Sequence, residues 1–315
     1  MNTWNTVKLP ARTHTPFAVL KNLMHREIAE HKGMIVKTPM IIGAVCMVLM
    51  LLGMIGGALA GNQLFELSQE ARNAQTMTPE VAAGVFQQIS GHYAYIGTIL
   101  AIVMPIMVFV YCVHTLYDER RTRSDLFWKS LPVSDIHVIA SKALTALVVI
   151  PVVYTAVFVV LAYATMACFA IVAAFLGWNV APALLSWGVL APLSVLAVIP
   201  VYVLWALPAV GYLLWVSAVS KSKPLLVALL IPLGAVAAVG VIDAFPHTNM
   251  SFAYDLVGRL LYSVVPFSWG EFNHTNPLSA WTILASPQMI AGVVLGGALL
   301  YATVRIRQKQ DDQTL

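Results

Sequence analysis

The sequence of 315 residues carries little charge. Only 10% of its residues are Asp, Glu, Lys or Arg, whereas 59% are hydrophobic, and the mean hydropathy is +0.80. Soluble domains carry about 25% charged residues, so this chain lacks the polar side chains needed to cover a water-exposed surface. The composition excludes a soluble enzyme, a nucleic-acid-binding protein and a disordered scaffold. It predicts an all-α integral membrane protein.

Cysteines and recognisable reactive motifs are also scarce. The three cysteines all fall in apolar runs, where we expect small buried side chains and no disulfides: Cys46, Cys112 and Cys168. No phosphate-binding G-x-x-x-x-G-K-[ST] run and no G-x-S-x-G run occurs. One group near the N-terminus contains metal-ligand residue types: His25, Glu27, Glu30 and His31. Its histidines are six residues apart, which does not fit a zinc-protease helix, so we expect no catalytic residue, metal or cofactor in this chain.

Six apolar runs are long enough to cross a membrane. They cover residues 39–60, 94–116, 143–176, 192–220, 225–242 and 288–304. The uncharged stretch 143–220 is too long for two minimal spans and too short for four, so we expect two crossings with spare length between them. The chain therefore divides into a basic segment, residues 1–38, and one six-span domain, residues 39–315.

Lysine and arginine are concentrated on one side of the predicted membrane. All but two of the 18 basic residues fall in segments on the N-terminal side of the predicted membrane, and the exceptions are Arg72 and Arg259. The positive-inside rule then predicts that both termini are cytoplasmic and that residues 61–92 and 243–287 lie outside. The first 38 residues have no apolar core of a signal peptide, so we expect the first span to direct insertion.

The segment before the first span is predicted to form a basic amphipathic helix on the cytoplasmic surface of the lipid membrane. Thr15 and Pro16 are typical of a helix start. Apolar residues then recur at helical spacing: Phe17, Leu20, Met24, Ile28 and Ile35. Two interpretations stay open, a plain membrane anchor and an elbow helix that moves during transport.

The loop 117–142 between the second and third spans is the most informative part of the chain. It opens with a charged run that includes Glu119 and Arg120, and Pro132 ends a predicted short helix. That helix contains Ser124, Asp125, Leu126, Phe127, Trp128, Lys129 and Leu131. Ser134 is expected to cap the next helix, which continues into the third span. The adjacent Phe127 and Trp128 need a cover, either the membrane interface or a partner protein.

The six runs contain no Asp, Glu, Lys or Arg, whereas ion-coupled transporters normally keep such residues there. If ATP drives this protein, a separate subunit must hydrolyse it. The fourth run carries four aromatic residues on one arc of a helix: Tyr202, Trp205, Tyr212 and Trp215. They either line a hydrophobic substrate path or pack against lipid or other helices. Gly292 and Gly296 have the small-residue spacing of closely packed membrane helices.

This layout and the loop sequence resemble the permease subunit of a type-2 ABC exporter. The resemblance rests on Glu119, Arg120, Leu131, Pro132, Val133, Ser134, Ser141 and Lys142. It implies that residues 124–131 form a coupling helix seated in a groove of an ABC ATPase subunit. It also implies two ATPase copies that bind ATP and Mg, a second permease copy or paralogue, an outer cap formed by helices after residue 243, and the inner (cytoplasmic) membrane of a bacterium.

These features together predict a permease subunit for ATP-driven export of an amphipathic or lipid-like substrate or a peptide. The alternative is a non-transporting transducer that uses the same ATPase coupling to act on a protein partner. A third class, an intramembrane enzyme, lacks a recognisable nucleophile or metal motif in this sequence.

Overall fold

The computed structural model describes residues 16–59, 79–122, 133–175, 190–245, 249–268 and 277–312. Within these ranges the chain is helical and contains no strand. Six of the described helical segments are long and apolar enough to cross a membrane: Gly33–Gly53, Ser90–Arg121, Asp135–Ile171, Pro192–Val219, Pro224–Asp243 and Pro287–Lys309. They overlap the six predicted runs, which confirms a helical protein with six candidate spans. The predicted coupling helix, residues 124–131, lies outside the described residues.

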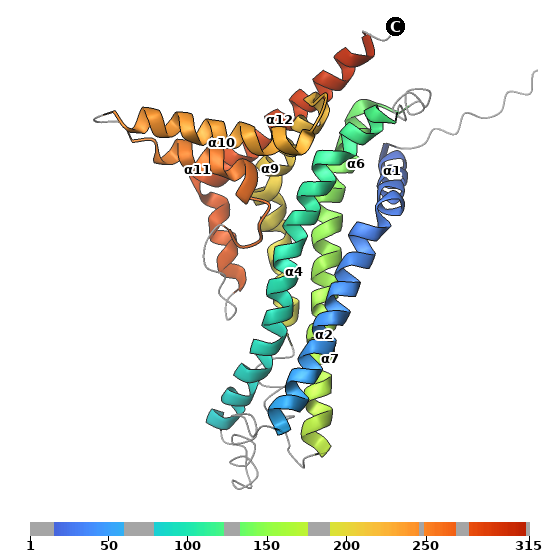
Figure 1. The fold of residues 1–315 in the computed structure, drawn as a ribbon, viewed down its shortest axis with the longest axis vertical. Helices are drawn as coiled ribbons and strands as arrows, with labels where there is room; N and C mark the ends of the chain where they lie inside the picture. Colours follow the sequence, from blue (N-terminus) through green and yellow to red (C-terminus); the bar gives the residue numbers. More distant parts are fainter. Residues whose placement is uncertain are drawn as a thin grey trace, which may run out of the picture.

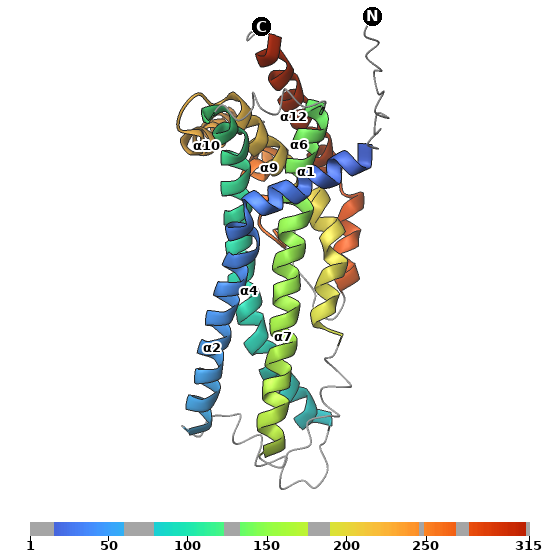
Figure 2. The same cartoon turned by 90° about the vertical axis from the view of Figure 1, so that its right-hand side faces the viewer.

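The elements follow one another as α1 (Pro16–Glu30), η1 (Gly33–Lys37), α2 (Thr38–Leu59), α4 (Pro79–Arg121), α6 (Asp135–Leu144), η2 (Thr145–Val149), α7 (Ile150–Phe175), η3 (Pro192–Val198), α9 (Ile199–Val219), α10 (Pro224–Asp243), α11 (Ser251–Tyr262), η4 (Pro277–Ala285) and α12 (Pro287–Asp312). Segments η1 and η2 are π-helical turns, and η3 and η4 are 3-10 helices. Helices α2, α4 and α7 run side by side along the long axis (Figure 1). Helices α1 and α6 and the C-terminal end of α12 lie together at one end (Figure 2).

Helix α9 is the central helix of the core. It packs against α4 on one side and α12 on the other. Several of its side chains are fully buried: Ala206, Ala209, Val210, Leu213, Leu214 and Val216. A helix that is apolar on all sides is stable only where neighbours or lipid surround it, and α9 meets this condition through neighbouring helices.

The contact between α9 and α12 is made by backbone. A Cβ atom at Gly211 would lie 2.7 Å from the carbonyl oxygen of Gly296. A Cβ atom at Gly296 would lie 2.7 Å from the backbone of Leu207. The close packing predicted from the glycine spacing is therefore present at Gly296, within this chain. Gly292 faces side chains instead, since its Cβ would meet the Nη1 atom of Arg259 at 3.3 Å.

Helix α1 forms where it is predicted, but its buried face differs from the predicted one. Leu23 and Glu27 are buried, whereas the Phe17 side chain is 76% exposed. Three members of the predicted apolar face are only partly buried: Leu20, Met24 and Ile28. The helix is turned so that the Glu27 carboxylate reaches the buried ammonium group of Lys142.

Helix α6 begins at Asp135, directly after Ser134, as predicted. Ser134 occupies the N-cap position, but the predicted capping hydrogen bond is wrong, because the Ser134 hydroxyl does not reach a backbone N–H of the first turn. It lies 2.6 Å from the Nδ1 atom of His137 instead. The chain then continues through η2 into α7, which gives the continuous third span that the sequence predicts.

Helix α10 departs most from the expected layout. Helices α10 and α11 lie side by side, crosswise to α4 and α7, at the end of the molecule that also holds α1 and α6 (Figures 1 and 2). The chain turns into α10 at Lys223, whose φ of 48° and ψ of 55° are left-handed. Near its start, α10 is held by the Tyr212 hydroxyl, which donates to the carbonyl of Ala228 at 2.9 Å. Near its end, Gly240 lies against the Tyr254 hydroxyl.

In a bilayer we expect α10 to cross the membrane, because large apolar side chains are exposed near both of its ends: Leu225, Leu226, Leu229, Leu230, Ile231, Leu233, Val241 and Ile242. A cysteine at Ser251, in a chain whose native cysteines have been replaced, should then react with an impermeant thiol reagent added to intact cells. A cysteine at Lys32, exposed after α1, should stay protected. Labelling of the Ser251 site only after membrane disruption would instead place α11 on the side of α1, as the crosswise arrangement does.

Candidate functional site

An ion network with a buried centre joins four helices at the end of the molecule where α1 and α6 lie. Its charged members are Arg26, Glu27, Glu119, Asp135, Lys142 and Arg307. They come from α1, α4, α6 and α12. Three carry positive charge and three carry negative charge, so the ion network is balanced when all of them are ionised.

Lys142 is the centre of the ion network. Its side chain is 1% exposed, and its Nζ atom lies 2.8 Å from Glu27 Oε1 and 2.9 Å from Glu119 Oε1. It also donates a hydrogen bond of 2.8 Å to Thr115 Oγ1. An ammonium group has three N–H donors, and all three have an acceptor here. The two carboxylates and the hydroxyl thus replace the water that Lys142 loses on burial.

Glu27 is nearly as buried as its partner, with 2% of its surface exposed. Its Oε2 atom accepts a 2.8 Å hydrogen bond from the Tyr111 hydroxyl. Burial raises the pKa of the Glu27 carboxyl, but the charge of Lys142 and the hydrogen bonds from Lys142 and Tyr111 lower it more. The resulting pKa of Glu27 lies below its ordinary value of 4.5. Glu27 is therefore a carboxylate at neutral pH.

Glu119 extends the ion network to α12 and back to α1. Its Oε2 atom lies 3.5 Å from Arg307 Nη1, and its Oε1 atom lies 3.6 Å from Arg26 Nη2. Arg307 also donates from Nε to Asp135 Oδ1 at 2.7 Å. Because Asp135 begins α6 and Lys142 lies in its last turn, both ends of this short helix are held by ions from other helices.

Arg120 follows Glu119 but faces α9. Its Nη2 atom donates to the carbonyl oxygen of Ser217 and, at 3.0 Å, to that of Ser220. A cation near carbonyls at the C-terminal end of a helix is electrostatically favourable. The Ser217 hydroxyl in turn accepts backbone N–H groups of Leu116 at 3.2 Å and Tyr117 at 3.0 Å. The C-terminal ends of α4 and α9 are thereby fixed together.

The ion network lies on both sides of the loop that the sequence singles out. Glu119 comes shortly before residues 123–132, and Asp135 and Lys142 come shortly after them. Of the predicted coupling residues, Glu119 belongs to the ion network and Arg120 lies beside it. The others fall outside the described residues: Ser124, Asp125, Leu126, Phe127, Trp128, Lys129, Leu131 and Pro132.

Sequence reasoning missed Glu27 and Arg307 as partners of this loop. A signal for Glu27 is present, because it follows Leu20, Leu23 and Met24 at helical spacing and so lies on an apolar face. A charge in such a position needs a partner of opposite sign. Lys142, directly before the apolar run 143–176, is the matching cation. No comparable local pattern marks Arg307.

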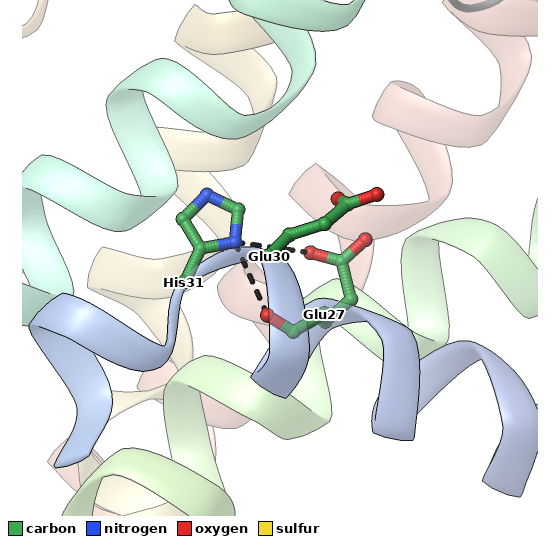
Figure 3. Close-up of side chains that lie close together, drawn as sticks. All are labelled: Glu27, Glu30 and His31. Carbon is green, nitrogen blue, oxygen red and sulfur yellow. Dashed lines mark hydrogen bonds and ion pairs between the residues drawn. The ribbon is translucent and has the colours of Figure 1, made fainter.

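Figure 3 shows Glu27, Glu30 and His31 close together, with one possible ligand atom of each within 4.8 Å of the others. The Nδ1 atom of His31 lies 3.2 Å from the Glu27 carbonyl oxygen and 4.0 Å from its carboxylate. The Glu27 carboxylate is already bound by Lys142, and Glu30 pairs with Arg26 at 2.7 Å. A metal would have to displace both cations, so we assign this group to the ion network and to the surface of α1.

The four aromatic residues predicted on one arc lie in α9 and pack against other segments. Tyr202, Trp205 and Tyr212 are buried, and Trp215 is half-buried. The Tyr202 hydroxyl donates to the carbonyl of Val264 at 2.9 Å. Trp205 Nε1 donates to Ser268 Oγ at 2.8 Å, and the Tyr212 hydroxyl donates to Ala228. Three of the four residues therefore bind α9 to neighbouring segments, a role that periodicity alone does not distinguish from lining a path.

A second buried cation lies against Trp205. Arg259 is 3% exposed, and its guanidinium lies 4.0 Å from the centre of the Trp205 ring. Its Nε atom donates to Asp255 Oδ2 at 3.1 Å, and its Nη1 atom donates to the carbonyl of Gln288 at 2.7 Å. The Tyr262 hydroxyl also donates to Asp255. Arg259 thus holds α11 against α9 and the start of α12.

Comparison of the chain with protein-family models, with curated proteins and with solved structures finds no match. The resemblance to type-2 ABC permeases therefore rests on the residues of the loop 117–142 and on the layout of the spans. Function must be argued from the candidate spans and the ion network.

Lys142→Met is expected to lower the free energy of unfolding by about 3–5 kcal/mol. The variant leaves Glu27 and Glu119 as buried negative charges without their shared cation. Adding Glu27→Gln should recover part of the loss, which a double-mutant cycle measures. Lys32→Met, at an exposed lysine, is the matched control. Equal unfolding temperatures for Lys142→Met and Lys32→Met in detergent would contradict a stabilising role for the ion network.

The lowered pKa of Glu27 predicts a loss of stability in acid. Because the pKa of Glu27 is lower in the folded chain, the contribution of its carboxylate to stability is fully present above its ordinary pKa of 4.5. It is lost as the pH falls through the folded-state pKa. Glu27→Gln should therefore flatten the fall of unfolding temperature below about pH 4, whereas Glu30→Gln, on the exposed side of α1, should not. The same slope in Glu27→Gln as in the native chain would refute this.

Proposed function

We propose that this chain is the permease subunit of an ATP-driven exporter, working as a dimer and coupled to separate ATPase subunits through the loop 117–142. One observation carries the proposal. Residues on both sides of 123–132 belong to a single ion network, buried at its centre, that reaches α1, α4, α6 and α12. A force applied to this loop by a partner would therefore act on two continuous helices, α4 and α12, and on two short ones, α1 and α6.

The positions of the charges support an external source of energy. In the described candidate spans, Asp, Glu, Lys and Arg lie near the ends and not in the middle. A proton- or sodium-coupled carrier normally needs ionisable groups within its spans. The sequence also has no phosphate-binding motif, so we assign ATP and Mg to the partner subunit.

The packing of α9 supports a pathway between two permease copies. Tyr202, Trp205 and Tyr212, the side chains most suited to line a path along α9, are buried against other segments of the same chain. The interior around α9 is closed by these contacts and by the backbone contact at Gly296. A path for an amphipathic or lipid-like substrate or a peptide would then lie at the boundary between copies.

The proposal is tested by identifying the protein that binds the loop 117–142. The tagged chain, purified from its native membrane in mild detergent, should bring down an ATPase with a phosphate-binding loop, at two copies per two permeases by mass spectrometry. Phe127→Ala with Trp128→Ala should lose this ATPase while insertion stays intact, because a buried interface Trp contributes about 2 kcal/mol or more, roughly thirtyfold in affinity.

The matched control is Phe252→Ala with Trp281→Ala, which removes one exposed Phe and one exposed Trp far from the loop in sequence. This control should keep the ATPase and its hydrolysis of ATP. Normal recovery of the ATPase in the Phe127 and Trp128 variant would overturn docking through the loop. Reproducible recovery of the native chain with no ATPase would overturn the proposed function itself.

A further inference from the structure

The short helices α1 and α6 each join a long helix through a π-helical turn. In η1, between α1 and α2, the N–H of Thr38 bonds to the carbonyl of Gly33. In η2, between α6 and α7, the N–H of Ile150 bonds to the carbonyl of Thr145. Each of these bonds spans five residues instead of four, so each turn holds one residue more than a regular α-helix. Such turns are rare and occur frequently at functional sites.

A proline follows each π-helical turn at the same place. Pro39 comes directly after Thr38, and Pro151 comes directly after Ile150. A proline lacks the N–H group, and its ring clashes with the carbonyl four residues earlier. Widening the helix by one residue at this point relieves the clash. The same local arrangement thus has the same sequence cause in two distant parts of the chain.

The two π-helical turns join two pairs of packed helices. Helix α1 packs on α6, and the pair is linked by the 2.8 Å contact of Glu27 with Lys142. Helix α2 packs on α7, and Figure 2 shows α1 and α6 beyond their ends. By contrast, α4 and α12, which supply Glu119 and Arg307, are unbroken helices through the ion network. The network therefore connects a jointed unit to two continuous helices.

We infer that η1 and η2 are paired joints at which α1 and α6 turn as one unit against α2 and α7. Sharp kinks in helices occur at prolines and at π-helical turns. A bend of about 20° at η2 moves the start of α6, about 15 residues or 22 Å away, by about 8 Å. Because both joints bend in the same direction, α1 and α6 stay packed. The Glu27–Lys142 pair stays intact during this movement. The contacts of Lys142 with Glu119 and of Asp135 with Arg307 break. The movement belongs to this chain alone, and only its use in transport rests on the proposed function.

The test measures distances within the full chain, held in lipid nanodiscs without a partner. Spin labels at Ile136 of α6 and Tyr301 of α12, which are 61% and 62% exposed, report the movement of α6 relative to a helix without a joint. The native chain should give a broad or double distance distribution with maxima up to about 8 Å apart. Pro151→Ala, which restores an N–H and removes the ring, should give one narrow maximum. Deletion of Val148, a half-buried residue of η2, should do the same by removing the extra residue.

The pairing of the joints has its own test. Pro39→Ala lies outside the segment between the two labels, yet it should also narrow the Ile136–Tyr301 distance distribution, because α1 holds α6 through the Glu27–Lys142 contact. Pro105→Ala, at a buried proline inside α4, should leave the distribution unchanged. Labels at Ile106 of α4 and Val160 of α7, two exposed positions outside the moving unit, should give one distance in every variant.

If Pro151→Ala narrows the distance distribution and Pro39→Ala does not, paired movement is refuted. If neither Pro151→Ala nor the Val148 deletion narrows it, the joints themselves are refuted. All of these results are independent of whether an ATPase binds. Failure of the inference is therefore distinguishable from failure of the proposed function.

Discussion

One end of this molecule is arranged around a single buried ammonium group, that of Lys142. Its three donors need three acceptors, and the chain supplies them from two other helices: Glu27 from α1, and Thr115 and Glu119 from α4. This requirement sets the rotation of α1. The helix turns Glu27 inward and leaves Phe17 exposed, since an unpaired buried charge costs more than an exposed phenylalanine.

Buried ions give rotational register to helices that apolar packing alone leaves undetermined. A helix such as α9 is apolar on all sides, so hydrophobic burial does not favour one rotation about its axis. Polar contacts supply the preference: Arg120 binds the carbonyls at the end of α9, and Arg259 binds along its middle through Trp205. In a chain with 59% hydrophobic residues, a few charges therefore determine how the helices face one another.

The features that the sequence predicts are local ones. Apolar runs set the candidate spans, and Ser134 followed by Asp135 marks the start of α6, because hydropathy and helix starts depend on neighbouring residues. The partners of Lys142 depend on distant chain segments, since Glu27 lies 115 positions away. The crosswise course of α10 depends on the turn at residues 220–223, where Ser220 is extended and Lys223 is left-handed, and composition does not reveal this turn. For Phe127 and Trp128, the sequence indicates that the aromatic side chains must be buried against some surface, but it does not show whether that surface is lipid or a protein.

The backbone contact between α9 and α12 has a consequence for the surrounding lipid. Where Gly211 meets Gly296, not even a methyl group fits between the two helices. An acyl chain is wider than a methyl group, so no lateral fenestration can open at this level while the two helices stay in register. A molecule that leaves or enters the bilayer must pass between another pair of helices, because α9 and α12 leave no gap between them.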